Sequence, residues 1–392
     1  MGAKELAAFG YHTDEVNLPV KKSAACILLA FAVSAFSAAL AQNPADHVET
    51  GKLGDAAYRI DMPTKWNGIL LIYYHGYSEN QVTFEKDKPN AMGDGFAAAG
   101  FAVAQSGYSV SGFAVEQAIP ETEALRKYTI AKYGQPKETY VLGHSMGGEL
   151  TMMSMEMYPS RYDGALPLCG LLEPATWAIG NAAAMRAAFD FYYPGLLPGP
   201  IGIPADAAFD EALVKKVLAA LPSNAKGMAE MMALGRLKTQ EDLASGMVFG
   251  TFVLRDFEQK LGASVVDNHN FLYNGGPDDN ALNDGVKRYT ASDAALAWLK
   301  TWYTPTGVLL KPTLAVHTTY DPVIPADGVR LYADQVQRAG SSANFVQQYV
   351  KHDGHCHISG PETAKALEEL VQWKHSGVKP KSGLLDVPEP AK

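Results

Sequence analysis

The stretch that most constrains the fold runs from Thr139 to Gly148 and reads TYVLGHSMGG. Its first half is apolar and β-forming, Ser145 stands between two glycines, and good helix formers follow. This order of strand, sharp turn and helix is the context of a nucleophile elbow, which holds a serine in a strained backbone conformation. Gly143 and Gly147 leave room for the chain to reverse. The pattern therefore predicts Ser145 as a nucleophile.

Residues 1–41 are predicted to be a signal peptide. Lys21 and Lys22 precede an apolar run over 23–40, and Ala39-Leu40-Ala41 has the small residues of a cleavage site. A spanning helix is the alternative, but the run is rich in alanine and serine. We expect a mature chain from Gln42, secreted or periplasmic and without a stable membrane anchor. Residues 1–19 carry acidic side chains, which indicates a misannotated start.

Composition limits the partners. The chain has 392 residues and a formal net charge of −9, which argues against nucleic acid. After signal cleavage two cysteines remain, Cys169 and Cys356. In an exported protein they form one disulfide or stay as two buried thiols, and their spacing leaves both possibilities open.

Strand and helix patterns alternate along most of the mature chain. The expected strands are 57–61, 68–74, 101–105, 140–142, 164–169, 313–317 and 344–350. The expected helices between them are 115–133, 291–301, 326–339 and 362–373. Such alternation predicts an α/β fold, with a mostly parallel sheet covered by helices on both faces.

The alternation stops at 171–290, where no strand pattern appears. Helical patterns cover 182–191, 207–221 and 225–234. An insertion of this length is too long for a loop, so we expect a helical cap. The core is then 42–170 and 291–375, and 376–392 is expected to be a loose tail. The cap is rich in methionine and aromatic residues, some of which should line an apolar substrate pocket.

A serine nucleophile needs a base, and the base needs an orienting acid, all at the carboxyl ends of strands. Asp321 directly follows the strand expected over 313–317, in a loop stiffened by prolines, and is our candidate acid. Asp163 precedes its strand and therefore lies at the wrong end. Asp353 is possible, but sits in the loop that carries the candidate base.

Three histidines compete for the role of base after the last strand of the core. We choose His355, because it follows Gly354, a natural reversal point beyond the strand end. His352 and His357 are the alternates. The three could instead hold a metal ion, but a fourth ligand is missing and Ser145 would have no role. We therefore expect neither a metal nor a cofactor.

The negative charge that develops on an attacked carbonyl oxygen needs fixed N–H donors. One is expected from the backbone of Met146, directly after the nucleophile. The second is expected from Tyr77, in the loop His75-Gly76-Tyr77 that follows the strand over 68–74. Gly76 would allow this loop to approach the substrate closely.

With the order Ser145, Asp321, His355, the chain resembles the α/β-hydrolase superfamily over roughly residues 68–373. Its GHSMGG run looks like that of many esterases, lipases and serine aminopeptidase-like hydrolases. The resemblance implies a Ser–Asp–His triad, no cofactor, and a cap between the sixth strand and the acid. Tannase-like esterases also place cysteines beside catalytic residues. Here Cys356 follows His355, but His144 stands before Ser145, so we do not assign the chain to them.

The expected reaction is hydrolysis of a small or medium carboxylic ester through an acyl-enzyme. A serine peptidase of the same fold is the alternative, and it would need an acidic group for the substrate amine. The candidates for that group are Glu149, Asp206, Asp210 and Glu211. A non-catalytic binding protein on a hydrolase scaffold is the third possibility, which the complete set of catalytic residues disfavours.

Overall fold

The computed structural model describes residues 47–207 and 210–387. The expected signal peptide over 1–41 lies outside the described residues. Within the described ranges, no helix combines the length and the apolar character that a membrane crossing requires.

A nine-stranded sheet forms the centre of the molecule, in the order β1-β2-β4-β3-β5-β6-β7-β8-β9. β2 pairs antiparallel with β1 and with β4, and the remaining neighbours are parallel. The central strands are continuous apolar runs because helices cover both of their faces. The strands are β1 (His47–Leu53), β2 (Ala56–Met62), β3 (Ile69–Tyr74), β4 (Ala102–Ser106), β5 (Glu138–His144), β6 (Gly164–Leu168), β7 (Thr313–Tyr320), β8 (Phe345–Asp353) and β9 (Gly383–Leu384).

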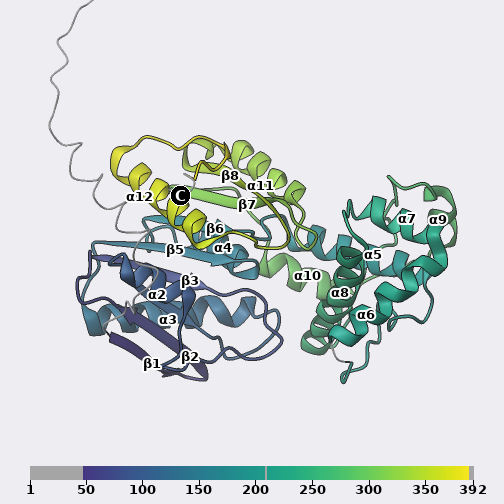
Figure 1. Ribbon diagram of the computed structural model, residues 1–392, viewed down its shortest axis with the longest axis horizontal. Coiled ribbons are helices and arrows are strands. Elements are labelled where there is room, and N and C mark those ends of the chain that lie inside the picture. Colours follow the sequence, from purple (N-terminus) through teal and green to yellow (C-terminus); the bar gives the residue numbers. More distant parts are fainter. Residues whose placement is uncertain (1–46, 208–209, 388–392) are drawn as a thin grey trace, which may run out of the picture.

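Helices lie on both faces of this sheet, so the predicted α/β fold class is confirmed (Figure 1). α2 (Ala91–Ala98) and α12 (Gly360–Ser376) pack on one face. α3 (Val115–Tyr133), α4 (Met146–Met157) and α11 (Ala326–Arg338) pack on the other, and the short η3 (Ser342–Asn344) precedes β8. The carboxyl ends of the parallel strands therefore meet at one edge, where loops can build a site.

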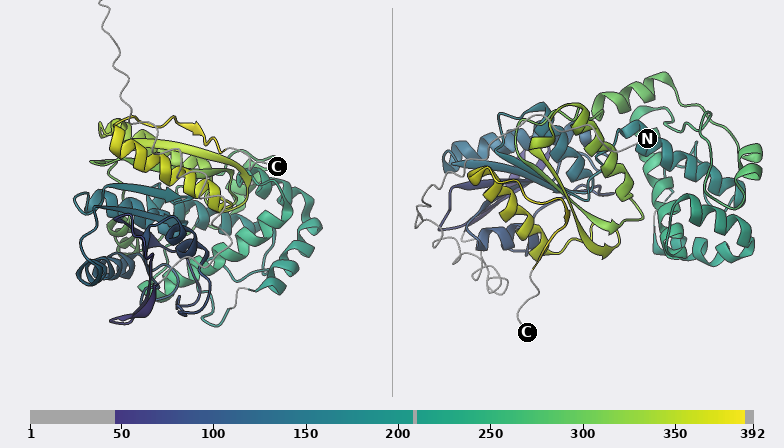
Figure 2. Two further views of the ribbon diagram at one scale, coloured as in Figure 1. Left: turned by 60° about the vertical axis from the view of Figure 1, so that its left-hand side comes forward. Right: turned by 90° about the horizontal axis from the view of Figure 1, so that it is seen from above.

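The segment between β6 and β7 is helical, as expected. Its helices α5 to α9 form a lobe at one end of the core, and α10 leads back to the sheet (Figures 1 and 2). The elements are α5 (Ala175–Tyr192), α6 (Glu211–Ala220), η2 (Leu221–Asn224), α7 (Ala225–Leu234), α8 (Gln240–Leu261), α9 (Asp279–Gly285) and α10 (Asp293–Trp302). Helix α8 was missed in the sequence, although Thr239 and Asp242 form a capping box at its start.

The expectation of a loose tail from residue 376 is wrong for much of the described part. After α12 the chain turns back, and β9 pairs parallel with β8, with Gly383 opposite Gln348. The side-chain amide of Gln348 also donates a hydrogen bond of 3.0 Å to the carbonyl oxygen of Lys381. The tail is held because β8 would otherwise be an edge strand with unpaired backbone groups.

Candidate active site

Ser145 stands at a sharp turn between β5 and α4. Its backbone has φ 58° and ψ −124°, a conformation that is strained for a side chain other than glycine. The chain reverses so tightly that a Cβ atom on Gly143 would collide with the carbonyl of Gly147, and one on Gly147 with the carbonyl of Tyr74. The two glycines are thus required by close approach, as the sequence predicted.

A chain of hydrogen bonds joins the three predicted catalytic side chains. Nε2 of His355 lies 2.8 Å from Oγ of Ser145. Nδ1 of the same ring lies 2.8 Å from Oδ2 of Asp321. The three residues follow β5, β7 and β8, which end at the same edge of the sheet. This is the arrangement in which a histidine takes the serine proton while the carboxylate orients the ring.

Asp321 is held as an ionised carboxylate. Its side chain is buried, which alone would raise its pKa, but the hydrogen bond and charge of His355 and the backbone N–H of Ile324 hold the pKa below its usual value. Oδ1 accepts hydrogen bonds from the backbone N–H groups of Val323 and Ile324, at 2.8 and 2.9 Å. These bonds fix the carboxylate with its other oxygen toward His355.

The alternate histidines lie elsewhere. Nε2 of His352 is 2.9 Å from a carboxylate oxygen of Glu362, and Nδ1 of His357 is 2.6 Å from the carbonyl oxygen of Asp353. In the described part of the chain no group of histidine, cysteine or acidic side chains is arranged to hold a metal ion.

The alternate acids also have other partners. Asp353 forms an ion pair with Lys238 of the cap, with 2.7 Å between Nζ and Oδ1. Asp163 accepts a hydrogen bond of 2.9 Å from the backbone N–H of Thr139, at the amino-terminal edge of the sheet. That edge is opposite the one that carries Ser145.

The loop expected to complete the oxyanion site passes directly beside the serine. A Cβ atom on Gly76 would lie 3.2 Å from Cβ of Ser145. Met146 is the first residue of α4, so its N–H has no acceptor within the helix. Tyr77 borders the same cavity as Ser145 and Met146, and its ring packs edge-on against Phe249 of the cap, with 5.6 Å between ring centroids.

Two further histidines near the triad have lowered pKa values. Burial, and then the charge of His355, lower the pKa of His144 to about 4, and Nδ1 of His144 lies 3.2 Å from the hydroxyl of Tyr73. Burial also lowers the pKa of His317, whose Nε2 lies 4.0 Å from Oδ2 of Asp321. His355 is therefore the histidine that has both an acid partner and the serine within reach.

The structure joins Cys169 and Cys356 in a disulfide, with 5.2 Å between their Cα atoms. Cys169 follows β6, and Cys356 follows His355 directly. The loop of the base is thus covalently linked to the strand beside the elbow, where the N–H of Ser145 donates to the carbonyl of Leu168 at 3.0 Å. Of the two possibilities left open by the sequence, the structure has the disulfide.

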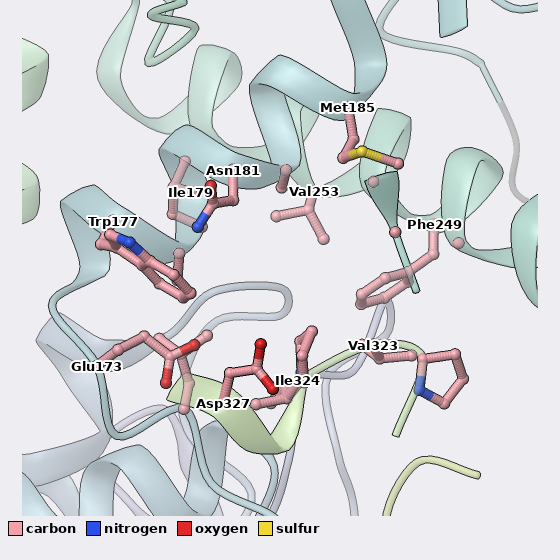
Figure 3. A pocket seen from close by; sticks show the side chains of 18 of the residues that line it. Glu173, Trp177, Ile179, Asn181, Met185, Phe249, Val253, Val323, Ile324 and Asp327 are labelled. Carbon is pink, nitrogen blue, oxygen red and sulfur yellow. The ribbon is translucent and has the colours of Figure 1, made fainter. Parts of the chain in front are cut away.

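A cavity of about 390 Å³ opens between the triad and the cap (Figure 3). Its cap wall is mostly apolar and includes Met185, Phe249 and Val253, while Val323 and Ile324 come from the loop after Asp321. The volume is in the range of sites that enclose a small ligand. The expectation that some cap methionines and aromatic residues line a pocket agrees with this lining.

Two buried acids in this cavity were not recognised together from the sequence. Glu149 lies in the first turn of α4, Glu173 follows β6, and each side chain is 1% exposed. Both oxygens of Glu149 and Oε2 of Glu173 have no hydrogen-bond partner in the described chain. Burial raises the pKa of Glu149 well above its usual value, with a further contribution from Glu173, and burial raises that of Glu173 to about 7.

The strand order, the elbow and the Ser145–His355–Asp321 geometry agree with one superfamily. The chain has the fold of the α/β-hydrolases. A family model described as a tannase-like family of unknown function (DUF6351) matches residues 39–221. This match opposes our decision to leave the chain outside the tannase-like esterases. The reason for leaving it outside was that no cysteine stands beside Ser145. In the structure Cys356 is bonded instead to Cys169, at the end of β6.

Similar solved structures include hydrolases of two kinds. Feruloyl esterase B from Aspergillus oryzae is 16% identical, with a TM-score of 0.45, over 83% of this chain and 78% of that one. An acylaminoacyl peptidase from Pyrococcus horikoshii is 10% identical, with a TM-score of 0.44, over 84% of this chain and 41% of that one. The chain thus spans less than half the length of that peptidase. No curated protein matches the sequence.

Proposed function

We propose that the protein is a serine hydrolase that cleaves carboxylic esters through an acyl-enzyme. The observation that carries the proposal is the pair of 2.8 Å contacts from His355 to Ser145 and to Asp321. A serine whose hydroxyl faces an imidazole, which in turn faces a buried carboxylate, is set up for nucleophilic attack on an acyl carbon.

In the proposed mechanism, Nε2 of His355 takes the proton of Ser145 as Oγ attacks the carbonyl carbon. The resulting oxyanion accepts hydrogen bonds from the backbone N–H groups of Met146 and Tyr77. His355 then gives its proton to the departing alcohol, and the acyl-enzyme forms. A water molecule activated by His355 releases the acid and restores Ser145. Asp321 keeps its charge throughout and stabilises the imidazolium.

The cavity suggests the size of the substrate. A cavity of about 390 Å³ beneath a cap fits a small or medium molecule with an apolar or aromatic part. The tannase-like description of the matching family also favours an ester as the scissile group. We propose that the cap, through residues such as Phe249, selects the acyl or alcohol part.

The alternative is a serine peptidase of the same fold, for which the acids Glu149 and Glu173 offer a place for a substrate amine. Among the acids considered in the sequence, Asp210 caps α6, and the side chain of Glu211 is 81% exposed beside Lys215. A non-catalytic binding protein is the third possibility. An active-site serine that reacts with a fluorophosphonate would exclude it.

The deciding experiment compares p-nitrophenyl acetate and octanoate with aminoacyl anilides, using wild-type protein and Ser145→Ala. We expect turnover of the esters, its loss in Ser145→Ala, and fluorophosphonate labelling of wild type alone. Faster hydrolysis of the anilides would favour the peptidase. No turnover of any substrate together with no labelling of Ser145 would refute the enzyme proposal.

Export from the cytoplasm is part of the same proposal. The disulfide between Cys169 and Cys356 is the kind of bond that persists in secreted and periplasmic proteins, and it supports the expected signal peptide. Sequencing the amino terminus of the mature protein tests this point. We expect it to begin at Gln42.

A further inference from the structure

The cavity beside Ser145 has an acidic wall whose charges are incompletely compensated. The charged residues that line it are Glu149, Glu173, Arg236, Asp242 and Asp327. Arg236 is the one cation of this described lining, and it forms an ion pair with Asp327. Asp242 accepts a hydrogen bond of 2.7 Å from the hydroxyl of Tyr320. Glu149 and Glu173 are thus left without a positive partner in the cavity.

Burying these two carboxyl groups is costly, because each loses its hydration while both oxygens of Glu149 and Oε2 of Glu173 gain no hydrogen bond in return. A hydrophobic pocket of the same shape would be cheaper to fold. Glu173 also packs against the first turn of α11, where a Cβ atom on Gly328 would overlap its carboxyl group. Its position is therefore fixed by close packing, and its Oε2 has no donor in the described chain.

We propose that Glu149 and Glu173 bind a protonated primary amine of the substrate, next to the scissile carbonyl. The inference rests on the proposed function and names a substrate class for it, an ester that carries a free amino group. Three oxygens of the pair lack a donor, both of Glu149 and Oε2 of Glu173. A primary ammonium group has three N–H donors and one positive charge, so it offers hydrogen bonds to these oxygens and balances the charge of one of the two carboxylates.

A hydroxyl group would satisfy these carboxyl oxygens less well than an ammonium group. It donates one hydrogen bond and brings no charge, so at least two of the three oxygens would stay unpaired. Trp177 adds a second element that suits a cation. Its side chain is 41% exposed and lies at the same end of the cavity as Glu173 (Figure 3). An ammonium group held near an indole face gains further electrostatic attraction.

The position of the pair limits where the amine can sit. Glu149 lies four residues after Ser145 on α4, which is about 6 Å along a helix axis. The amine should therefore be only a few bonds from the reacting carbonyl carbon. Amino esters of increasing chain length will show one preferred separation.

The first test measures kcat/KM for ethyl esters of ω-amino acids with two, four and six carbons, beside the alkyl and hydroxy esters of matched length. We expect the amino ester to be preferred at least tenfold at one length. Glu149→Gln and Glu173→Gln should reduce this preference ratio at least tenfold. Glu211→Gln, which removes an exposed acid of the cap, is the matched control and should retain it. Circular dichroism and the fluorophosphonate labelling rate verify folding of each variant.

The second test does not depend on turnover. Binding of 2-phenylethylammonium and 2-phenylethanol to Ser145→Ala is measured by calorimetry, and again after adding Glu173→Gln. We expect the amine to bind at least tenfold more tightly, and Glu173→Gln to abolish the difference. Equal binding of amine and alcohol, or a preference for alkyl or hydroxy esters at every length, would overturn the inference. Hydrolysis of neutral esters would then leave the proposed function intact. Amine binding without turnover of any ester would support the amine site and contradict the proposed function.

Discussion

Cys356, the residue after His355, is bonded to Cys169 at the end of β6. β6 is the neighbour of β5, and β5 ends at the elbow that carries Ser145. The disulfide therefore connects the loop of the base with the strand next to the nucleophile. Sγ of Cys356 lies 3.5 Å from Nε2 of His355, so the bond also borders the ring itself.

We expect reduction of this disulfide to lower both activity and stability. The bond closes a long loop, with a sequence separation of 187, and such bonds contribute about 2–4 kcal/mol to the free energy of unfolding. Loss of the link should also let His355 move from Ser145 and lower kcat more than it raises KM. Ester hydrolysis and urea unfolding with and without dithiothreitol measure both effects. The double variant Cys169→Ser, Cys356→Ser should resemble the reduced protein and be insensitive to dithiothreitol; full kcat after verified reduction would contradict the expectation.

The choice among the three histidines gives a second prediction. His355→Ala should lower kcat by about 10⁴-fold or more, as removal of a triad base does in serine hydrolases. His352→Ala and His357→Ala are matched controls from the same loop, because their rings face Glu362 and the carbonyl of Asp353. We expect both to retain kcat within about threefold, which is well below the change for a group in the transition state. A large loss in either control, with His355→Ala active, would reverse the assignment.

The candidate site could be predicted from the sequence because its residues are tied to strand ends. An apolar β-run is readable locally, and the carboxyl ends of parallel strands share one edge, so Ser145, Asp321 and His355 were placed together without knowledge of any contact. The structure brings the three into hydrogen-bond distance. Most core elements were also expected within a few residues, for example α3 over Val115–Tyr133.

The features that the sequence did not reveal depend on contacts between distant segments. Cys169 and Cys356 are far apart in the chain, and no local pattern indicates that β6 and the loop after β8 lie together. Glu173 has no motif of its own, and its importance appears only when Glu149 is found beside the same cavity. β9 pairs with the side of β8 that β7 leaves open, and this side is known only once the order of the sheet is known.

Phe249 is expected to shape the apolar side of the cavity. It contacts the ring of Tyr77 and lines the space above Ser145. Phe249→Ala should raise KM for p-nitrophenyl octanoate roughly tenfold, in line with the ~1–2 kcal/mol that a lost aromatic contact costs, and have less effect on the acetate. Phe191→Ala is a suitable control, because Phe191 belongs to the same cap, is 37% exposed and packs beside Gly285. An equal change for both esters would show that Phe249 does not contact the acyl chain.

The raised pKa of Glu173 predicts how the stability of the unliganded protein depends on pH. Burial raises this pKa from 4.5 to about 7, so between these values the unfolded chain releases a proton that the folded protein keeps. The folded state then binds more protons than the unfolded state, and the free energy of unfolding must fall as the pH rises from about 4.5 to about 7. The shift corresponds to on the order of 3 kcal/mol. Glu173→Gln cannot ionise and should lack this loss.

Urea unfolding of wild type and Glu173→Gln at pH 5, 6 and 7 measures the effect. We expect the free energy of unfolding of Glu173→Gln to rise relative to that of wild type as the pH rises. The variant does not lose the stability that wild type loses when Glu173 ionises. Glu211→Gln, at an exposed position of the cap, should follow wild type at every pH. A constant difference across the three pH values would mean that Glu173 titrates at its ordinary value. In that case the carboxylate of Glu173 already has a counter-charge or hydration in the folded protein. This result would contradict the unpaired state from which the amine site is inferred.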